Sequence, residues 1–387
     1  GSEMCIRDSH MAYEGPIMTQ ERFDIFLTCP PGLESALASE LAENGFAKCR
    51  PGQGGVTIKG GWSDVWRANL QTRGATRVLA VVDQFKTQHL NQLGQHARQT
   101  PWQTLFHPGT PVKVEATCRK SRIYHDGAAA ERVSDAIART ALADITDDAD
   151  ITVRVRIDHD EVTLSLDTSG EPLHKRGYKE AVAKAPLRET LAALVLREMG
   201  YDGRAPLLDP MCGSGTFVIE AAQLAAGLAP GRARSFAFER LANFDRDAFM
   251  ALRNRPPHAR SDIACLGFDR DPGAIRMSME NAERADVSDR TQFAQSALKD
   301  LARPEGAPGW VVTNPPYGAR IGDKSAVFSV YKTFGEVMRE RFSGWRAALI
   351  TTDEKMAKAT GLAFEQTSAP IDHGGLKIRL YVTGPLK

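Results

Sequence analysis

The chain has 387 residues, of which 42% are hydrophobic and 25% are charged, and its formal net charge is +1. This length exceeds one ordinary core and the proportions are those of a folded protein, so we expect two or three domains and exclude a disordered or fibrous chain. The near-neutral charge does not by itself indicate a nucleic-acid-binding protein, and residues 18–170 hold 17 Lys plus Arg against 19 Asp plus Glu.

Residues 1–17 contain the GS and HM pairs that cloning sites leave behind, so we interpret them as a vector-derived tag and expect Met18 to be the natural start. No apolar run approaches the roughly 20 residues of a membrane-spanning helix, and no basic stretch followed by an apolar one marks a leader. The six cysteines are scattered, without a CxxC pair or a histidine at ligand spacing. We therefore expect a cytoplasmic protein with reduced thiols, no bound metal and no membrane partner.

The first 170 residues predict two compact α+β units. Residues 18–75 form the first, in which an extended segment at 23–29 is followed by a helical pattern at 32–46. Residues 76–170 form the second, which ends in a hairpin of alternating strands at 151–170. The remaining strands and helices of the two units are expected at 55–60, 62–72, 77–85, 111–116 and 128–143.

A linker with a helix is expected to join these units to a larger α/β domain. Within the linker, residues 171–200, the stretch 187–199 is amphipathic at helical spacing. In residues 201–387 strands alternate with helices, which predicts a Rossmann-like domain with a doubly wound, mainly parallel sheet. Residues 227–260 interrupt this alternation, and their content of Pro, Arg and Phe indicates an insertion.

The strongest motif is PLLDPMCGSGTFVIEAA at residues 206–222, where an apolar strand ends in Asp209 and a glycine-rich turn opens a helix. Gly213 and Gly215 allow a tight turn close to a ligand, and the helix N-terminus offers free amide donors. The turn completes neither GxGxxG nor GxxxxGK[ST], so we favour the smaller cofactor S-adenosylmethionine, with a plain tight turn as the structural alternative. The candidate cofactor-binding residues are Asp209, Cys212, Gly213, Ser214, Gly215 and Thr216.

A second motif, at residues 263–285, places Asp269 at the end of a buried strand that leads into a helix. An acidic residue at the end of the second strand can accept hydrogen bonds from both ribose hydroxyls, so Asp269 and the adjacent Arg270 are candidates for cofactor binding. The structural alternative for an aspartate here is a helix cap. Asp271 is the better candidate for that cap, because Pro272 follows it at a first-turn position.

The third motif is VVTNPPYGAR at residues 311–320, an apolar strand that ends in Asn314, two prolines and a tyrosine. The lone pair of an exocyclic base amine is delocalised into the ring, so a methylating site must orient the amine and favour charge on its nitrogen. The Asn314 side-chain oxygen and the Pro315 carbonyl can accept its two hydrogens, and Tyr317 can stack on the base. The candidate catalytic residues are Asn314, Pro315, Pro316 and Tyr317, and Asn314 is also a candidate for cofactor binding. A Pro-rich turn is the structural alternative.

Together these motifs resemble the cofactor and catalytic motifs of class I amino-methyltransferases. The segment LSLDTSGEPLHKRGYKEAVAKAPLRETLAA at 164–193 resembles the junction in THUMP-containing RNA guanine-N2 methyltransferases, especially the bacterial enzymes of large-subunit ribosomal RNA. This similarity spans residues 18–387. It implies a ferredoxin-like unit, a THUMP domain that holds RNA and a class I Rossmann-like catalytic domain. It also implies S-adenosylmethionine as cofactor and N2-methylguanosine as product.

The resemblance further implies contacts with RNA in two basic groups. One group falls in the THUMP unit, and the other in the segment that joins it to the catalytic half. Such groups neutralise phosphates, although for each one alone a solvated charged face is the commoner explanation. The first group is Arg119, Lys120 and Arg122, and the second is His174, Lys175, Arg176 and Lys179.

One position departs from the family pattern. Enzymes of this family commonly carry an acidic residue after the third strand to accept the adenine amine, whereas TQFAQSALKDL at 291–301 places Ser296 there. A serine hydroxyl can still accept a hydrogen bond. We therefore expect Ser296 and the backbone around Ala297 to share the adenine contact.

Three other functions stay open from the sequence. The same chemistry on tRNA is the nearest, because THUMP domains also hold tRNA in kindred enzymes. A DNA adenine-N6 methyltransferase would suit the NPPY tetrad equally, but no DNA-reading motif occurs in the first half. A non-catalytic RNA-binding assembly factor is the third. We expect a monomer with one catalytic centre.

Overall fold

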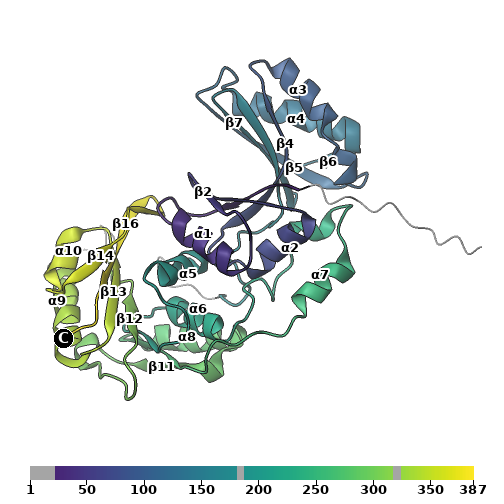
Figure 1. Ribbon diagram of the computed structural model, residues 1–387. Coiled ribbons are helices and arrows are strands. Elements are labelled where there is room, and N and C mark those ends of the chain that lie inside the picture. The colour runs from purple at the N-terminus through teal and green to yellow at the C-terminus, as the bar shows by residue number, and fades with distance from the viewer. Residues whose placement is uncertain (1–21, 181–186, 317–323) are drawn as a thin grey trace, which may run out of the picture.

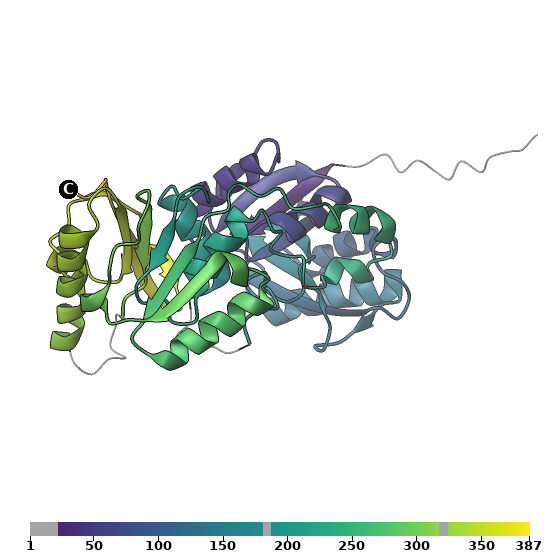
Figure 2. The same cartoon turned by 90° about the horizontal axis from the view of Figure 1, so that it is seen from below.

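The computed structural model describes residues 22–180, 187–316 and 324–387. The expected tag at 1–17, the expected start at Met18 and the candidate catalytic residue Tyr317 lie outside these ranges. Within them the molecule is elongated, with an N-terminal half and a C-terminal half side by side (Figures 1 and 2). No helix of the described residues is long and apolar enough to cross a membrane.

The N-terminal half is built on one continuous sheet rather than on two separate sheets. The strand β4 is ten residues long and is shared, since residues 77–80 pair with β1 and residues 79–86 pair with β8. The sheet order is β2-β3-β1-β4-β8-β7-β5-β6. Its strands are β1 (Phe23–Thr28), β2 (Arg50–Gly52), β3 (Gly55–Gly60), β4 (Arg77–Lys86), β5 (Pro111–Arg119), β6 (Asp144–Ile145), β7 (Ile151–Asp158) and β8 (Glu161–Asp167).

The part of the N-terminal half that holds β5, β6 and β7 lies at the top of Figure 1 and is called the upper lobe. Alternation of side chains explains why helices cover one face of the sheet there. In β7 the residues Ile151, Val153, Val155 and Ile157 are buried, while the residues between them are more exposed. The buried side packs on α4, and Figure 1 shows α3 beside α4 on that face. The helices of this half are α1 (Glu34–Glu43), α2 (Trp62–Gln71), α3 (Leu90–Gln99) and α4 (Asp126–Ala141).

The C-terminal half contains a second sheet, in the order β11-β10-β9-β12-β13-β16-β14. The neighbouring strands from β11 to β13 are parallel, and β16 runs antiparallel to both β13 and β14. This confirms the expected mainly parallel α/β sheet. Its strands are β9 (Leu207–Asp209), β10 (Cys265–Asp269), β11 (Thr291–Gln295), β12 (Trp310–Thr313), β13 (Arg346–Thr351), β14 (Phe364–Thr367) and β16 (Leu376–Thr383), with β15 (Ile371–His373) paired to β16.

The two faces of this sheet bury different side chains, so the sheet is doubly wound. Leu207 and Val312 belong to the core shared with the helices α5, α6 and α8, whereas Leu208 and Val311 belong to the core under α9 and α10. Figure 2 shows α9 and α10 at the end of the molecule remote from the N-terminal half. The helices are α5 (Glu189–Glu198), α6 (Thr216–Ala225), α7 (Arg246–Arg253), α8 (Pro272–Arg284), α9 (Lys324–Arg341) and α10 (Glu354–Ala359).

The expected insertion at 227–260 is an ordered bridge between the two halves. It contains a 3-10 turn (Ala237–Arg240) and α7, and its aromatic rings pack on α2 of the N-terminal half. The Phe244 ring lies edge-on to Trp66 with centroids 5.8 Å apart, and Phe238 lies 5.0 Å from Phe249. Aromatic contacts of this kind are favourable beyond their buried area.

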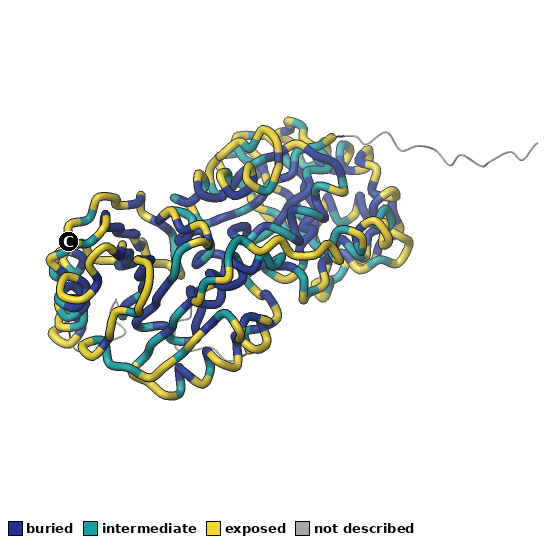
Figure 3. The backbone as a smooth tube through the Cα atoms, turned by 60° about the horizontal axis from the view of Figure 1, so that its bottom comes forward, coloured by how far each residue is buried: buried dark blue, intermediate teal, exposed yellow. Residues whose placement is uncertain are grey.

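A continuous hydrophobic core crosses the joint between the halves, and Figure 3 shows buried backbone running from one lobe into the other. Charged side chains are sealed within the same joint. Glu220 of α6 accepts hydrogen bonds from Arg73, after α2, and from Arg176 of the linker, at 3.3 and 3.2 Å. The linker residue Arg176 is therefore part of the interior of this joint.

Candidate active site

A cavity of about 400 Å³ opens at the carboxyl ends of the parallel strands of the C-terminal half. Its walls come from the segments after β9, β10, β11 and β12 and from the first turns of α9. Ligands of open α/β sheets bind in such a crevice, where the strand order reverses. The lining residues that the sequence predicted are Asp269, Arg270, Ser296, Ala297, Asn314 and Pro316.

The glycine-rich loop after β9 has the expected tight turn. Gly213 and Gly215 have φ values of +54° and +81°, a region that favours glycine. A Cβ on Gly215 would lie 3.1 Å from the Ser278 side chain of α8, so the loop approaches that helix closely. The loop is also tied to β10, because the Cys212 amide donates to the Phe268 carbonyl over 2.9 Å.

Asp269 joins this loop to the end of β10. Its Oδ2 accepts a hydrogen bond from the Gly213 amide at 3.0 Å, and its Oδ1 accepts one from the Asp271 amide at 2.9 Å. Each carboxylate oxygen can accept a second bond, and the residue lines the cavity. Asp271 caps α8, as expected, since its side chain accepts from the Gly273 amide.

Ser296 lies beside Asp269 at the end of β11. Its amide donates to the Asp269 carbonyl at 2.9 Å, and its hydroxyl donates to the Ala297 carbonyl at 3.2 Å. The hydroxyl proton is thus directed at a neighbour, and the Oγ lone pairs stay available on the cavity wall. A serine in this setting can accept a hydrogen bond from a ligand amine.

Asp209 ends β9 beneath the loop and is almost completely buried. Burial raises the pKa of its carboxyl to about 7, and the nearby Asp269 charge adds to this, although a hydrogen bond from the Met211 amide opposes it. The carboxyl thus changes protonation near neutral pH, at the base of the loop.

Asn314 follows the fully buried strand β12 and also lines the cavity. Its Oδ1 is shielded from solvent, and no donor among the described residues forms a hydrogen bond with it. An unpaired buried amide oxygen costs free energy, about 1–3 kcal/mol, unless a ligand supplies a donor. This oxygen therefore fits the hydrogen of an entering amine.

Six predicted cofactor residues, Asp209 and residues 212–216, are not among those that line the cavity. The Cys212 thiol is buried against Ser278, with the sulfur 3.8 Å from its hydroxyl, and burial raises its pKa. The Thr216 hydroxyl accepts a hydrogen bond from the Lys179 ammonium at 2.9 Å. Ser214 is buried, and its carbonyl accepts from the Asn281 side chain. Cys212, Ser214 and Thr216 therefore hold the loop in place through contacts with α8 and with the linker.

The residues predicted to contact RNA divide into exposed and interior ones. Arg119, Lys120 and Arg122 are exposed on a loop of the upper lobe, and Lys175 is exposed on the linker. The side chains of Arg176 and Lys179 are only 2% and 9% exposed. Both are engaged with buried carboxylates of the C-terminal half, so in this structure neither can meet a phosphate.

His174 is half-buried on the linker, and its pKa is lowered to about 4 by burial and by neighbouring cations, Arg188 foremost. It is therefore neutral at physiological pH and adds no positive charge to the surface.

Sequence reasoning missed the wall that α9 contributes. Ser329 and Thr333 lie about one helical turn apart, and both line the cavity together with Val330. They belong to no motif of their own. The only signal for them was that a helix must follow the NPPY strand in a doubly wound sheet.

Within the described residues no group of His, Cys, Asp or Glu side chains could hold a metal ion. The sheet order, the glycine-rich loop after its central strand and the cavity at the strand ends define a class I methyltransferase. The chain belongs to the family of RMKL-like methyltransferase domains, which matches residues 176–379. Residues 24–79 match the RlmL ferredoxin-like domain, and residues 87–167 match the THUMP domain.

Individual relatives agree with this family. The ribosomal RNA large subunit methyltransferase K/L of Methylococcus capsulatus is 35% identical over 93% of this chain and 51% of the relative. A putative RNA methyltransferase of Synechocystis is 32% identical over 92% of this chain and 95% of the relative. The chain thus spans about half the length of the K/L relatives and nearly all of the second one.

A solved structure, that of the putative methyltransferase SMU.472 complexed with SAH, is 27% identical. The two structures superpose with a TM-score of 0.83 over 95% of this chain and 99% of the other. The expected cofactor, S-adenosylmethionine, agrees with the family and with that complex, because SAH is what remains of it after methyl transfer.

Proposed function

We propose that this chain transfers a methyl group from S-adenosylmethionine to the exocyclic N2 of a guanosine in large-subunit ribosomal RNA. Membership of a methyltransferase family supports the reaction, and the name of the Methylococcus capsulatus relative supports the RNA. The THUMP match supports an RNA-holding role for the N-terminal half. The observation that carries the choice of an amine is Asn314 Oδ1 on the cavity wall, which is buried and has no hydrogen-bond partner among the described residues.

The donor set at the cavity fits the proposed cofactor. When bound, S-adenosylmethionine supplies a methyl group made electrophilic by its sulfonium charge. Asp269 has one free acceptor position on each oxygen for a ribose hydroxyl, and Ser296 Oγ can accept from the adenine amine. The glycines of the loop keep side chains out of the space beside them. We propose Asp209, Arg270 and Ala297 as further cofactor-binding residues.

Asn314 positions the base amine in this proposal. Its Oδ1 accepts one hydrogen of N2, and the Pro315 carbonyl accepts the other, so the nitrogen lone pair points out of the ring plane toward the methyl carbon. A bond forms between nitrogen and the methyl carbon as the bond from that carbon to sulfur breaks. The nitrogen then holds an excess proton, whose charge Asn314 Oδ1 stabilises until the proton passes to water.

The target base must be unpaired or extruded, because a stacked and paired amine cannot enter the cavity. We retain Tyr317 as the proposed stacking partner of that base on the NPPY pattern alone. Pro315 and Pro316 fix the backbone that follows Asn314, since a proline ring locks its own φ and restricts the residue before it.

The test is methylation in vitro with a cofactor whose methyl group is deuterated. Purified protein is incubated separately with large-subunit ribosomal RNA, tRNA and DNA from cells lacking the gene, and labelled nucleosides are identified by mass spectrometry. We expect labelled N2-methylguanosine in the ribosomal RNA alone. Label in tRNA would identify tRNA as the substrate, and label on adenine N6 of DNA would identify a DNA adenine methyltransferase. No label in any nucleic acid would refute the proposal.

A further inference from the structure

Lys179 of the linker is a buried cation, with only 9% of its side chain exposed. Its ammonium donates hydrogen bonds to the Thr216 hydroxyl at 2.9 Å and to the Leu187 carbonyl at 3.0 Å. A third partner is Glu189, whose Oε1 lies 3.4 Å from the same nitrogen. An ammonium has three donors, and three acceptors among the described residues surround this one, so the side chain is fixed in one position.

Thr216 lies where the glycine-rich loop becomes a helix. It is the first residue of α6, and Gly215, with a φ of +81°, directly precedes it. The Thr216 side chain is buried, and neither Thr216 nor Lys179 is among the residues that line the cavity. Lys179 can therefore act on a ligand in the cavity only through the loop.

The helix α8 holds the loop and the linker next to each other. Asn281 of α8 donates a hydrogen bond to the Ser214 carbonyl at 3.1 Å. Arg284 of the same helix donates one to the Tyr178 carbonyl at 2.7 Å. Since Lys179 directly follows Tyr178, its ammonium is carried to the start of α6 on a backbone that is itself fixed.

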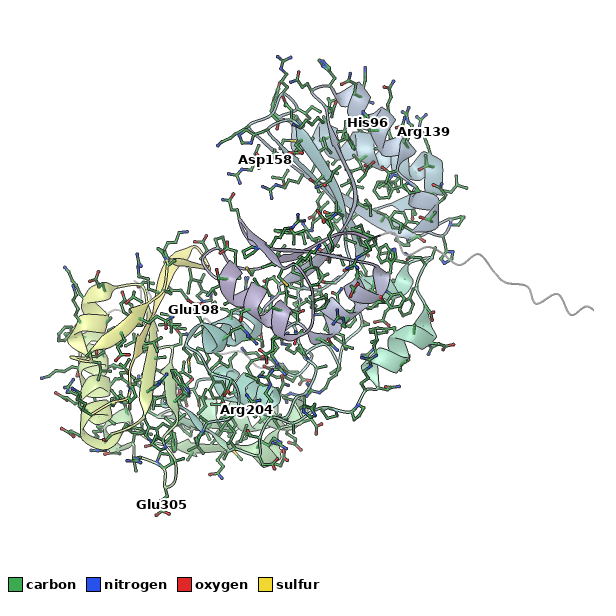
Figure 4. All side chains as sticks on the ribbon, in the orientation of Figure 1. His96, Arg139, Asp158, Glu198, Arg204 and Glu305 are labelled. Atoms are coloured by element: carbon green, nitrogen blue, oxygen red, sulfur yellow. The ribbon has the colours of Figure 1, made fainter. Side chains whose placement is uncertain are left out.

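The pair of Lys179 with Glu189 extends these contacts to the joint between the halves. Glu189 is the first residue of α5 and is 3% exposed. The helix α5 packs on α6 and on α1 of the N-terminal half, and Figure 4 shows Glu198, its last residue, at that joint. One cation therefore connects the loop, the linker and a helix that contacts the N-terminal half.

The stability of the fold does not account for a cation in this place. Burying an ion pair costs desolvation that offsets much of its attraction, and an apolar pair of similar size often stabilises a fold as well. A cation at the N-terminus of a helix is also unfavourable for that helix, because the free amides there carry partial positive charge. What Lys179 supplies is a directional hydrogen bond that holds the Thr216 hydroxyl in place.

We propose that Lys179 is a positioning residue for S-adenosylmethionine. By holding Thr216 Oγ1 it fixes the start of α6, and with it the backbone of residues 213–215, beside which the cofactor binds. A loop that is held in its binding conformation in advance loses less entropy when the ligand arrives. The inference rests on the cofactor site of the proposed function and adds to it a linker residue that lies outside the cavity.

Isothermal titration calorimetry of the whole chain with S-adenosylmethionine tests the contact. Thr216→Val keeps the shape of the side chain but removes the acceptor, so it should bind the cofactor about 10-fold more weakly, the effect of losing one hydrogen bond to a charged group. Thr216→Ser retains the hydroxyl and should restore the affinity to within about twofold of the wild type.

Thr360→Val is the matched control. Thr360 is 1% exposed, and its hydroxyl donates to the Ala357 carbonyl at the end of α10. This variant should lower the melting temperature and leave the cofactor affinity unchanged. A Thr216→Val variant that behaves in the same way, less stable but with the affinity of the wild type, would show a structural role alone and overturn the inference.

A double-mutant cycle tests whether Lys179 acts through Thr216. Lys179→Met is combined with Glu189→Gln, so that no carboxylate is left buried without its cation. If the ammonium acts through the hydroxyl, adding Thr216→Val to this pair weakens cofactor binding no further, and the total stays at about 10-fold. Additive effects, about 100-fold in total, would overturn the inference. The two Thr216 variants decide the matter if the charge-free pair does not fold.

Methylation kinetics separate this inference from the proposed function. Calorimetry needs no RNA, so a wild type that binds S-adenosylmethionine but methylates no RNA refutes the proposed function, and the Thr216 variants still decide the role of Lys179. With an active wild type, Lys179→Met with Glu189→Gln should raise the KM for S-adenosylmethionine about 10-fold and leave the KM for RNA unchanged. A raised KM for RNA with unchanged cofactor affinity would make Lys179 an RNA contact and overturn the inference.

Discussion

The backbone amide of Gly213 donates a hydrogen bond of 3.0 Å to Asp269 Oδ2, so the loop after β9 and the end of β10 are fastened to each other. The other oxygen of the same carboxylate accepts from the Asp271 amide. Both donors are backbone amides, and Asp269 also lines the cavity. One side chain therefore shapes the loop and can also bind a ligand.

Asp269→Ala should weaken S-adenosylmethionine binding by about 100-fold or more, because it removes charge-assisted acceptors and the anchor of the loop. Isothermal titration calorimetry measures the effect. Asp271→Ala is the control, since it removes the cap of α8 at a cost of about 1 kcal/mol of stability and should leave cofactor affinity within about threefold. Cofactor binding by Asp269→Ala equal to that of the wild type would contradict the ribose role.

Asn314→Ala should reduce the single-turnover rate of methyl transfer by about 100- to 1000-fold, the usual effect of losing one group that stabilises developing charge. Its cofactor affinity should stay within about threefold, because the side chain faces the amine. Rapid-quench kinetics and calorimetry on the same preparation separate the two quantities. Weak cofactor binding with a normal rate would assign Asn314 to the cofactor instead.

The parts of the site that lie within short sequence motifs could be predicted, whereas the parts that depend on packing between distant elements could not. Asp209, the glycine-rich turn, Asp269 and Asn314 each end a strand of a parallel sheet, and parallel strands bring their carboxyl ends to one edge. A short motif therefore gives both a residue and its position. The wall made by Ser329 and Thr333 depends on how α9 crosses the sheet, which no short motif records.

In the N-terminal half, too, the sequence predicted local elements but not their long-range pairing. The sequence predicted a strand at 77–85. The pairing of residues 77–80 with β1 and of residues 79–86 with β8 depends on contacts between segments far apart in the sequence. The two predicted units match the ferredoxin-like and THUMP domains, but the sequence did not predict that one sheet runs through both. Likewise, Arg176 and Lys179 belong to a basic run in the sequence, yet packing of the linker on α6 places both inside.

The stability of the cofactor-free protein should depend on pH through Asp209. Its folded-state pKa is about 7 against an ordinary value of 3.8, so between these values the folded protein binds more protons than the unfolded chain. The contribution of this group to the free energy of unfolding is thus fully present below about pH 4. It decreases as the pH rises to about 7, by at most about 1.4 kcal/mol per pH unit.

Asp209→Asn removes that dependence and serves as the reference. Urea denaturation of both proteins without cofactor at pH 5 and pH 8 should show the wild type losing stability relative to the variant at pH 8. A difference between the two proteins that is the same at both pH values would show that Asp209 does not titrate in this range.

The two glycines of the loop should respond differently to alanine. Gly215→Ala combines a positive φ with a contact of 3.1 Å to Ser278, whereas Gly213→Ala has the φ cost but open space around the new methyl. The first should lower the melting temperature and cofactor affinity together, and the second should cost only about 1 kcal/mol of stability. Differential scanning calorimetry ranks them. The reverse order would mean that the approach of the loop to α8 is not tight.

Glu220→Gln should destabilise the whole molecule by about 3–5 kcal/mol, because it removes the carboxylate that pairs with the buried guanidinium groups of Arg73 and Arg176. The three residues come from the N-terminal half, the linker and the cofactor-loop helix. Loss of Glu220 should therefore uncouple the halves and turn one thermal transition into two. The control is Arg204→Gln, whose pair with Asp202 is exposed and contributes at most about 1 kcal/mol. A single transition at the wild-type temperature in Glu220→Gln would mean that the apolar core and the aromatic bridge alone hold the halves together.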